Sequence, residues 1–307
     1  MKCHGCQKVV YHKDVQQNQM VCTLCGYHYR VKARKRISWL VDPDSFEETW
    51  AGIESVDPLG FVIPEVGFSY PEKLAQAKQK SGMNEALVTG FARIENTRTV
   101  LGAMDFSFRG GSMGSALGEK FCRAASDAVR ENLPLIMLAA SGGARMEEGI
   151  LSLMQMAKTA DAVHEMNDAG IPYICVLTNP TTGGVYASFA SLADITIAEP
   201  GAHIGFAGPR LIEGALKVKL PEGFQSAEYQ FENGFVDMIV PRTKLRPLLG
   251  KLLRYLTPEG RIPWHPRRTE QRMVETPAAP ATAPPPHLRI TRILREYCDS
   301  SLGPHYV

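Results

Sequence analysis

The stretch that decides the fold runs from Leu135 to Arg145 and reads LIMLAASGGAR. Its first six residues are apolar, which is typical of a β-strand buried on both faces. Ser141-Gly142-Gly143 then opens a predicted helix with apolar residues at helical spacing, namely Ile150, Leu153, Met154 and Ala157. A glycine pair allows a tight turn and leaves no Cβ in front of the backbone N–H groups. Such N–H groups at the start of a helix can form an oxyanion hole or bind a phosphate.

The same strand–glycine–glycine–helix pattern occurs twice more. Thr99 to Phe106 leads into Gly110-Gly111, and Pro172 to Leu177 leads into Gly183-Gly184. One such pair is more often only a tight turn, so the repetition carries the inference. Three units predict stacked ββα repeats in an α/β fold.

The composition is that of a globular protein with an uneven charge. The 307 residues are 44% hydrophobic, enough for one large domain or two ordinary ones. The formal net charge is +2, but residues 1–36 hold eight Lys or Arg against the single Asp14, and the rest carries −5. No apolar run approaches the ~20 residues of a membrane span, and no signal-peptide pattern precedes Cys3. We therefore predict a cytoplasmic protein.

Four of the seven cysteines form the pattern Cys3-x2-Cys6-x15-Cys22-x2-Cys25. Two close pairs of thiolates can converge tetrahedrally on one zinc ion, and Gln7 and Gly26 follow the pairs as tight knuckle turns require. A segment this short cannot bury a core, so the metal would hold it together. We predict a zinc ribbon over residues 1–36, with one structural zinc per chain.

The other polar residues of this segment are expected on its surface. Because four cysteines fill the predicted site, three histidines are left over, namely His4, His12 and His28. The run from Arg30 to Arg36 has two interpretations. It could bind a phosphate-rich partner such as RNA or DNA, or it could be a solvated helix face that leads into the next domain.

The carboxyl end differs from the rest of the chain. Pro277 to Pro286 holds five prolines in ten residues, which predicts an extended linker over residues 258–287. Residues 288–307 are predicted to form a short amphipathic helical tail. The remaining span, residues 37–257, contains all three glycine units and is the predicted main domain.

Six sequence blocks resemble the β subunits of the carboxyltransferase component of bacterial and plastid acetyl-CoA carboxylase. They follow the four-cysteine pattern in order, so the resemblance runs from Cys3 to about Leu256. The blocks are FSFRGGSMGSALG (106–118), SGGARMEEGILSLMQMAK (141–158), LTNPTTGGVYASF (177–189), AEPGAHIGFAGPRLI (198–212), LPEGFQSAEY (220–229) and GFVDMIV (234–240). The tail from about Pro258 lies outside the resemblance.

The resemblance implies a crotonase-like fold for residues 37–257, a superhelix of ββα units with an acyl-CoA site. It implies an enzyme that transfers a carboxyl group from carboxybiotin on a carrier protein to acetyl-CoA. The product is malonyl-CoA, in the first committed step of fatty acid synthesis. The implied partners are an α subunit of the same fold in an α2β2 tetramer, the biotin carboxyl carrier protein and biotin carboxylase. The chain would be inactive without the α subunit.

The resemblance also implies which residues form the site. Gly142 and Gly143 would donate backbone N–H groups to the thioester oxygen, where negative charge builds as the acetyl group loses a proton. Residues expected to line the cavity are Thr181, Thr182, Gly183, Gly184, Gly205 and Phe206. The blocks contain no obvious general base, and the family implies that the biotin ureido anion takes the proton.

Further residues of the blocks have open roles. Arg109, Arg145 and Arg210 are candidates to bind the phosphates of coenzyme A, although the last two could instead form interior ion pairs. Three methionines are expected to pack in the core, namely Met146, Met154 and Met156.

Two other functions remain open. A different crotonase-type acyl-CoA enzyme, a hydratase or a decarboxylase, would need neither a four-cysteine ribbon nor a biotin-bearing partner. A nucleic-acid-binding zinc-ribbon protein would use the basic residues 1–36. The −5 charge of the remainder and the lack of interleaved aromatic and basic residues argue against that as the main function.

Overall fold

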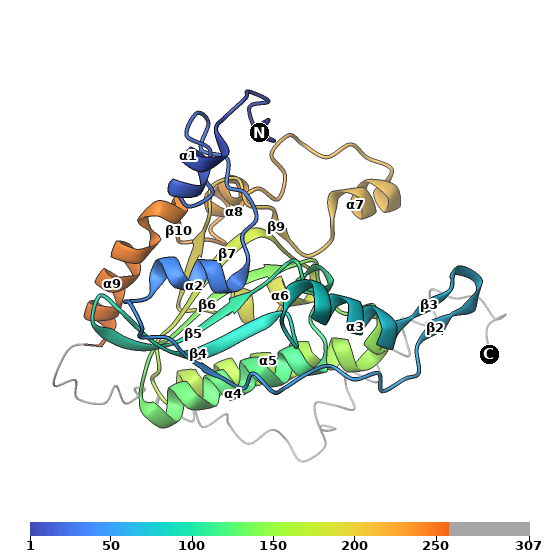
Figure 1. Ribbon diagram of the computed structural model, residues 1–307, viewed down its shortest axis with the longest axis horizontal. Helices are drawn as coiled ribbons and strands as arrows, with labels where there is room; N and C mark the ends of the chain where they lie inside the picture. The colour runs from blue at the N-terminus through green and yellow to red at the C-terminus, as the bar shows by residue number, and fades with distance from the viewer. Residues whose placement is uncertain (258–307) are drawn as a thin grey trace, which may run out of the picture. The chain divides into compact units, whose positions relative to one another are not determined.

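The strands predicted from the glycine turns lie side by side in one mixed sheet (Figure 1). The computed structural model describes residues 1–257, without the side chains of residues 66, 209–211 and 216, and the predicted linker and tail (258–307) lie outside the described residues. The strand order is β1-β4-β5-β6-β7-β8-β10, with β9 paired to β7. The strands are β1 (Glu47–Thr49), β4 (Leu87–Ile94), β5 (Thr97–Met104), β6 (Leu135–Ser141), β7 (Tyr173–Thr182), β8 (Ile195–Ala198), β9 (Ile204–Gly205) and β10 (Met238–Ile239).

The middle of the sheet is parallel. β4 and β5 first form an antiparallel hairpin, and its turn residues Glu95 and Asn96 both have positive φ, at 48° and 68°, as a type I′ turn requires. From β5 through β8 neighbouring strands run parallel, so that their carboxyl ends meet at one edge. The predicted α/β fold is confirmed.

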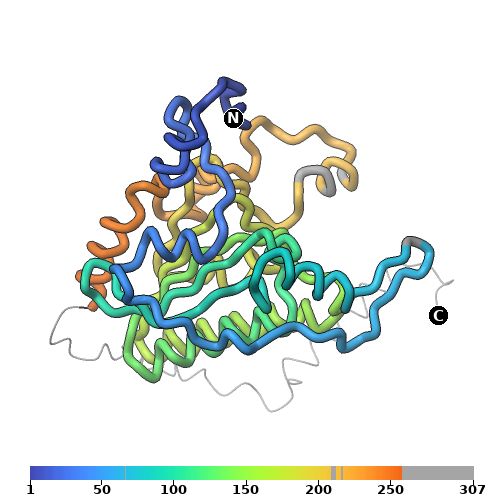
Figure 2. The backbone as a smooth tube through the Cα atoms, in the orientation of Figure 1, coloured from blue at the N-terminus to red at the C-terminus, as the bar shows by residue number. Residues whose placement is uncertain are grey.

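Helices cover the sheet from both sides. α4 (Ser115–Glu131) and α5 (Gly149–Asp168) pack against each other on one side, and α2 (Ala33–Leu40) and α9 (Leu245–Leu256) contact β4 and β5 on the other (Figures 1 and 2). Further helices are α1 (His12–Gln17), α3 (Tyr70–Ser81), α6 (Gly183–Tyr186), α7 (Pro209–Leu216) and α8 (Ala227–Glu232). An arm formed by β2 (Val62–Ile63) and β3 (Phe68–Ser69) extends away from the sheet (Figure 2). In the described part of the chain, no helix is long and apolar enough to cross a membrane.

Strand β6 lies at the centre of the hydrophobic core. Every residue from Leu135 to Ser141 is buried, which confirms the prediction of a strand covered on both faces. Its parallel neighbour β7 is equally buried from Tyr173 to Thr178. The two strands therefore form a rigid support for the glycine turns at their carboxyl ends.

The helix after the central turn differs from the prediction in its start and in its buried face. It begins at Gly149, after a short 3-10 turn at Met146–Glu148. The expected apolar face is on the surface, with exposed fractions of 63% for Ile150, 52% for Leu153 and 57% for Met154, and Ala157 is exposed as well. Met146 is 82% exposed, so only Met156 of the three methionines packs against the core.

The buried face of α5 is polar in its first half, at Ser152, Gln155 and Thr159, and apolar in its second half, at Ala162, Val163 and Met166. Ser152 and Thr159 are buried at little cost because their hydroxyls donate to nearby backbone carbonyls. The Ser152 hydroxyl donates to Met113 O at 2.5 Å, and the Thr159 hydroxyl donates to Gln155 O at 2.9 Å. Helical spacing predicted burial of the face with Ile150, Leu153, Met154 and Ala157, whereas the structure buries the other face, where these hydrogen bonds satisfy the polar side chains.

Candidate functional site

The four predicted metal ligands lie together in residues 1–36, the segment that we call the head. All four Sγ atoms of Cys3, Cys6, Cys22 and Cys25 lie within 4.8 Å of one another. The Cys3 and Cys25 sulfurs are 3.7 Å apart. A tetrahedral site with Zn–S bonds of ~2.3 Å has sulfurs about 3.8 Å apart. The four thiols therefore fit a tetrahedral metal ion such as zinc.

The backbone around the cysteines repeats one turn twice. Gln7 and Gly26 have positive φ, at 60° and 74°, and their N–H groups donate to Cys3 O and Cys22 O. An antiparallel bridge closes each turn, one between Lys2 and Val9 and the other between residues 21 and 28. Both turns are the expected knuckles, because each brings its cysteine pair to one point.

His28 is not a surface residue, contrary to the prediction. Its side chain is only 5% exposed. Nδ1 lies 2.8 Å from Gly26 O, and Nε2 lies 3.1 Å from the backbone nitrogen of Arg242, from which it accepts a hydrogen bond. Burial lowers the pKa of His28, which keeps the ring neutral and able to accept this bond. Its partner lies 214 positions away, so no local pattern could reveal it.

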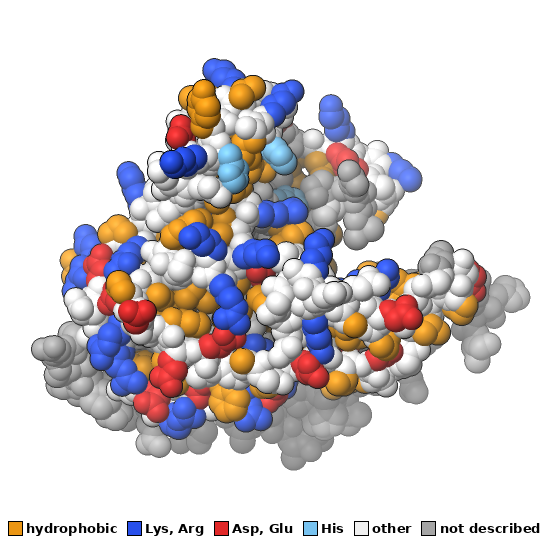
Figure 3. Space-filling view, in the orientation of Figure 1, with side chains coloured by type: hydrophobic (Ala, Val, Ile, Leu, Met, Phe, Trp, Pro, Cys, Tyr) orange, Lys and Arg blue, Asp and Glu red, His pale blue; other side chains and the backbone are white. Residues whose placement is uncertain are grey.

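The basic run at the end of the head, from Arg30 to Arg36, is not a uniform solvated face. Arg30 stacks over Phe106 at 4.1 Å, and Arg34 pairs with Glu48 at 2.5 Å. Arg36 is buried and pairs with Glu199 at 2.6 Å. Other Lys and Arg side chains are spread over the head and the centre of the face in Figure 3. Lys35 lies over the Trp39 ring at 5.4 Å, so four of the run's five cations are engaged within the protein.

The two glycine pairs at the ends of β6 and β7 contact each other. A Cβ built on Gly143 would lie 3.5 Å from Gly183 Cα, and one built on Gly183 would lie 2.7 Å from Gly143 Cα. Both residues have positive φ, at 121° and 63°. Only glycine suits both the conformation and the close approach. The structure thus brings two of the predicted site segments together.

The N–H groups that are free to bind a ligand at these turns are not the ones predicted. Gly142 N–H donates to Gly110 O at 2.8 Å, and Gly143 N–H donates to the Ser141 hydroxyl at 3.0 Å. Both predicted oxyanion donors are therefore already bonded. Within residues 1–257, the N–H groups of Ala144 and Gly184 have no hydrogen-bond partner. The free donors lie one residue further along each turn. At the first turn Gly110 O and the Ser141 hydroxyl accept from the earlier N–H groups, and at the second turn Phe206 O accepts from Gly183 N–H.

The other predicted cavity residues divide into a buried set and an accessible set. Thr181 is fully buried, and its hydroxyl is bonded to Ala139 O and Thr178 O. Thr182 is half-buried and donates to Ser141 O at 3.0 Å. Gly205 is buried at the end of β9, whereas the neighbouring Phe206 side chain is 63% exposed. Thr181 therefore supports the turn, and Phe206 offers an aromatic surface beside it.

Arg145 is an interior ion-pair residue and cannot bind a phosphate. Its side chain is completely buried, and all five guanidinium donors are used. Two bonds go to the Glu85 carboxylate at 2.5 and 2.8 Å. The others reach the Ser55 hydroxyl and the hydroxyl and carbonyl of Ser112. Of the other two candidates, Arg109 pairs with Glu147, and the side chain of Arg210 lies outside the described residues.

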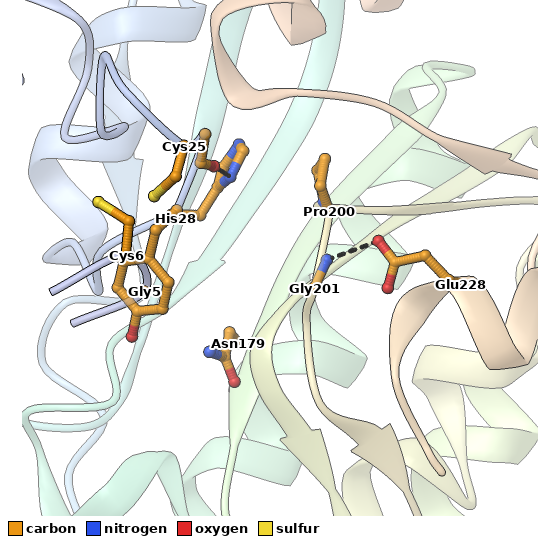
Figure 4. Close-up of a pocket in the computed structure, with 10 residues that line it drawn as sticks. Gly5, Cys6, Cys25, His28, Asn179, Pro200, Gly201 and Glu228 are labelled. Carbon is orange, nitrogen blue, oxygen red and sulfur yellow. Dashed lines mark hydrogen bonds between the residues drawn. The ribbon is translucent and has the colours of Figure 1, made fainter. Parts of the chain in front are cut away.

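A pocket of about 460 Å³ separates the head from the carboxyl ends of β7 and β8 (Figure 4). On the head side it is lined by Gly5, Cys6, Cys25, Gly26, Tyr27 and His28, and on the sheet side by Asn179, Pro200, Gly201 and Glu228. A hydrogen bond of 2.9 Å from Gly201 N–H to the Glu228 carboxylate shapes the sheet side. Because Asn179 lies in β7 just before the glycine turn, the pocket adjoins the site.

An apolar surface lies beside the site. The exposed side chains of α5 continue onto the segment that leads into the arm and onto its first strand, where Val56, Leu59 and Val62 are also exposed. The two parts adjoin, because a Cβ on Gly149 would lie 3.0 Å from the Leu59 side chain. A contiguous apolar surface of this kind is typical of a protein–protein interface.

Comparison with known proteins identifies a family. The family model for the carboxyl transferase domain matches residues 30–243. The acetyl-coenzyme A carboxylase carboxyl transferase subunit beta of Synechococcus sp. (strain CC9605) is 51% identical over 253 residues, 82% of this chain and 85% of the relative. The protein of the same name from Gloeobacter violaceus is 53% identical, with 82% of each chain covered.

Solved structures share the fold. Transcarboxylase 12S, solved with methylmalonyl-coenzyme A bound, has a TM-score of 0.62 at 23% identity. The match covers 79% of this chain and 43% of that one. The Pseudomonas malonate decarboxylase MdcD–MdcE heterodimer has a TM-score of 0.56 at 22% identity, with 73% and 86% covered. At these identities the likeness concerns the fold.

Proposed function

The chain belongs to the carboxyl transferase family, and we propose that it is the β subunit of an acetyl-CoA carboxylase carboxyl transferase that carboxylates acetyl-CoA to malonyl-CoA. This reaction would begin fatty acid synthesis. The structural observation that supports it most directly is the contact between the two glycine turns, which leaves two backbone N–H groups free beside it. In this proposal residues 37–257 form a crotonase-like domain and residues 1–36 a zinc ribbon.

The free N–H groups of Ala144 and Gly184 are the proposed oxyanion donors, in place of those of Gly142 and Gly143. Removing a proton from the acetyl group places negative charge on the thioester oxygen, and two fixed donors stabilise that charge. Loss of one such donor in other enzymes costs ~2.7–4 kcal/mol. Gly184 N lies 3.9 Å from the position of a Gly143 Cβ, so both donors border the same contact.

No side chain at the turns is suited to act as the general base. Glu147 is paired with Arg109. The Glu148 carboxylate is buried and accepts from the Tyr70 hydroxyl at 2.7 Å and from Ser115 N–H at 2.6 Å. Biotin, brought by a carrier protein, would supply the carboxyl group and a ureido nitrogen to accept the proton. This chain would hold the acyl group, orient it and exclude water.

The four cysteines are proposed to hold one structural zinc ion. Four protein thiolates close the coordination shell, so the metal would stabilise the head without binding substrate. The predicted cytoplasmic location would keep these cysteines reduced and able to bind the metal.

The apolar surface formed by α5 and the arm is proposed to bind the α subunit. Exposed Ile150, Leu153 and Met154 lie a few residues after the central turn, so a partner there would close the site against water. The biotin carrier would then enter between the subunits, and biotin carboxylase would recharge it.

The decisive test is malonyl-CoA formation by the purified chain with and without an α subunit, using carboxybiotin as the donor. We expect turnover only with both chains. Turnover by this chain alone would contradict the two-subunit proposal, and decarboxylation without carboxybiotin would favour a different acyl-CoA enzyme. Tight RNA or DNA binding without carboxyl transfer would favour the nucleic-acid alternative.

A further inference from the structure

A buried ion cluster joins the head to the sheet. Glu199 follows β8 directly and is completely buried. Its Oε1 accepts from Arg36 Nη1 at 2.6 Å and from Arg242 Nε at 2.7 Å. Its Oε2 accepts from the Nη2 atoms of the same two residues, at 3.2 and 2.7 Å. The carboxylate is thus held by two guanidinium groups.

The cluster has more positive than negative charge. Two guanidinium groups face one carboxylate, and an uncompensated charge in a dry interior is strongly unfavourable. Backbone carbonyls of the head supply the missing acceptors for Arg242. Its Nη1 donates to Gln19 O at 3.0 Å and to Met20 O at 3.4 Å, and its Nη2 donates to Tyr29 O at 3.0 Å. The second arginine, Arg36, makes no such bond to residues 1–29.

These acceptors depend on the fold of the head. Gln19 and Met20 both have left-handed φ, at 51° and 59°, and Met20 N–H donates to Val15 O at 2.7 Å. The apolar core behind them is small and consists of Cys3, Val10, Val15, Cys22 and Tyr29. Two of these five are predicted metal ligands, so loss of the metal would release the three carbonyls from Arg242.

On its other side, Glu199 is connected to the glycine turn by a short series of backbone hydrogen bonds. Glu199 N–H donates to Leu177 O at 3.0 Å, and Ala202 N–H donates to Glu199 O at 3.1 Å. Further along the same loop, Thr181 N–H donates to His203 O and Gly183 N–H donates to Phe206 O, both at 2.9 Å. Residues 199–206 therefore hold the end of β7 and the turn that follows it.

We propose that Glu199 and Arg242 are positioning residues that couple the metal state of the head to the Gly183–Gly184 turn. With metal bound, the backbone carbonyls of the head accept hydrogen bonds from the Arg242 guanidinium. Arg242 and Arg36 then hold the Glu199 carboxylate, and with it the 199–206 loop, in place. Without metal, the 199–206 loop becomes more mobile, and the hydrogen bond from Gly183 N–H to Phe206 O is lost. The catalytic consequence rests on the proposed function, whereas the structural coupling does not.

The test is amide hydrogen exchange, followed by peptide mass spectrometry, on the full chain before and after removal of the metal with a chelator. Loss of hydrogen bonds to a charged group predicts exchange at least about tenfold faster in peptides covering 199–206. Exchange in residues 135–138 should stay unchanged, because this part of β6 pairs with β5 and with residues 173–176 of β7. Faster exchange confined to residues 1–36, or spread through 135–138 as well, would overturn the proposal.

Two matched variants locate the connection. Arg36→Met and Arg242→Met each remove one guanidinium from Glu199, but only Arg242 contacts the head carbonyls. We expect Arg242→Met to show fast exchange at 199–206 with or without metal, and Arg36→Met to keep the response to metal. An equal response to metal in both variants would refute the role of Arg242. The wild-type comparison with and without metal decides the coupling even if a variant fails to fold.

Activity provides a second readout in the complex with the α subunit. The coupling predicts that metal removal lowers kcat more than it raises KM for acetyl-CoA, because the turn acts on the reacting carbonyl. Exchange needs no substrate. If carboxyl transfer is never observed but the exchange response is, the proposed function fails and the coupling stands. The reverse result would reject the coupling alone.

Discussion

Gly183→Ala tests whether the contact between the glycine turns is catalytic. The new Cβ would lie 2.7 Å from Gly143 Cα, whereas an ordinary contact begins at 3.4 Å, so the turns must separate by about 0.7 Å. The bond from Gly183 N–H to Phe206 O is 2.9 Å long, so a shift of that size at the second turn would break it and displace the neighbouring Gly184 N–H. We therefore expect loss of one oxyanion donor, which lowers kcat by about 10²–10³-fold, equivalent to ~2.7–4 kcal/mol.

Two control variants separate catalysis from backbone strain. Gly234 also has positive φ, at 77°, but has open space around its Cβ position, so Gly234→Ala carries the conformational cost of ~1–2 kcal/mol without the collision. Gly142→Ala places a Cβ 3.4 Å from Gly110 O and involves no positive φ. The assay is steady-state malonyl-CoA formation by the α–β complex, with thermal unfolding measured alongside. A kcat for Gly183→Ala equal to that of Gly234→Ala would refute the reasoning.

Three further predictions follow from the head, the buried cluster and the apolar surface. Metal analysis should find one zinc per chain, and Cys22→Ser should reduce it below half while the helices of residues 37–257 persist; full zinc in this variant would reject the site. Burial acts to raise the pKa of Glu199, but Arg36 and Arg242 hold it well below its usual range, so the folded state gains stability above pH ~4.3 and loses it as the pH falls further. Denaturant unfolding of Glu199→Gln should show a free energy of unfolding about 3–5 kcal/mol lower than wild type at pH 7 and a smaller difference at acid pH. If the stability of the variant falls with acid pH as steeply as that of the wild type, this assignment is wrong. Leu153→Asp on the exposed side of α5 should weaken binding of the α subunit at least about tenfold in calorimetry, with Asp161→Ala as the control on the same helix, and unchanged affinity would exclude this surface.

Several features followed from the sequence because their determinants are local. The apolar run from Leu135 to Ala140 predicted a strand buried on both faces, and the structure confirms it. The two Cys-x2-Cys pairs specified their own knuckle turns, because each turn closes within five residues. The glycine pairs marked the ends of β6 and β7 for the same reason: they meet a backbone requirement at one point of the chain.

The remaining features were decided by partners far away in the chain. The sequence made Arg145 a candidate to bind phosphate. In the structure its guanidinium donors bond to Glu85, 60 positions away, and to Ser112. At the central turn Gly142 N–H is not free because it donates to Gly110 O. His28 can be buried because its Nε2 accepts from the backbone N–H of Arg242. The sequence by itself determined the strands, the glycine turns and the cysteine centre, because each needs only neighbouring residues. Only the tertiary structure decided which face of α5 is buried, which donors stay free and which charges are paired, because burial and hydrogen bonding are satisfied between segments that meet only when the chain folds.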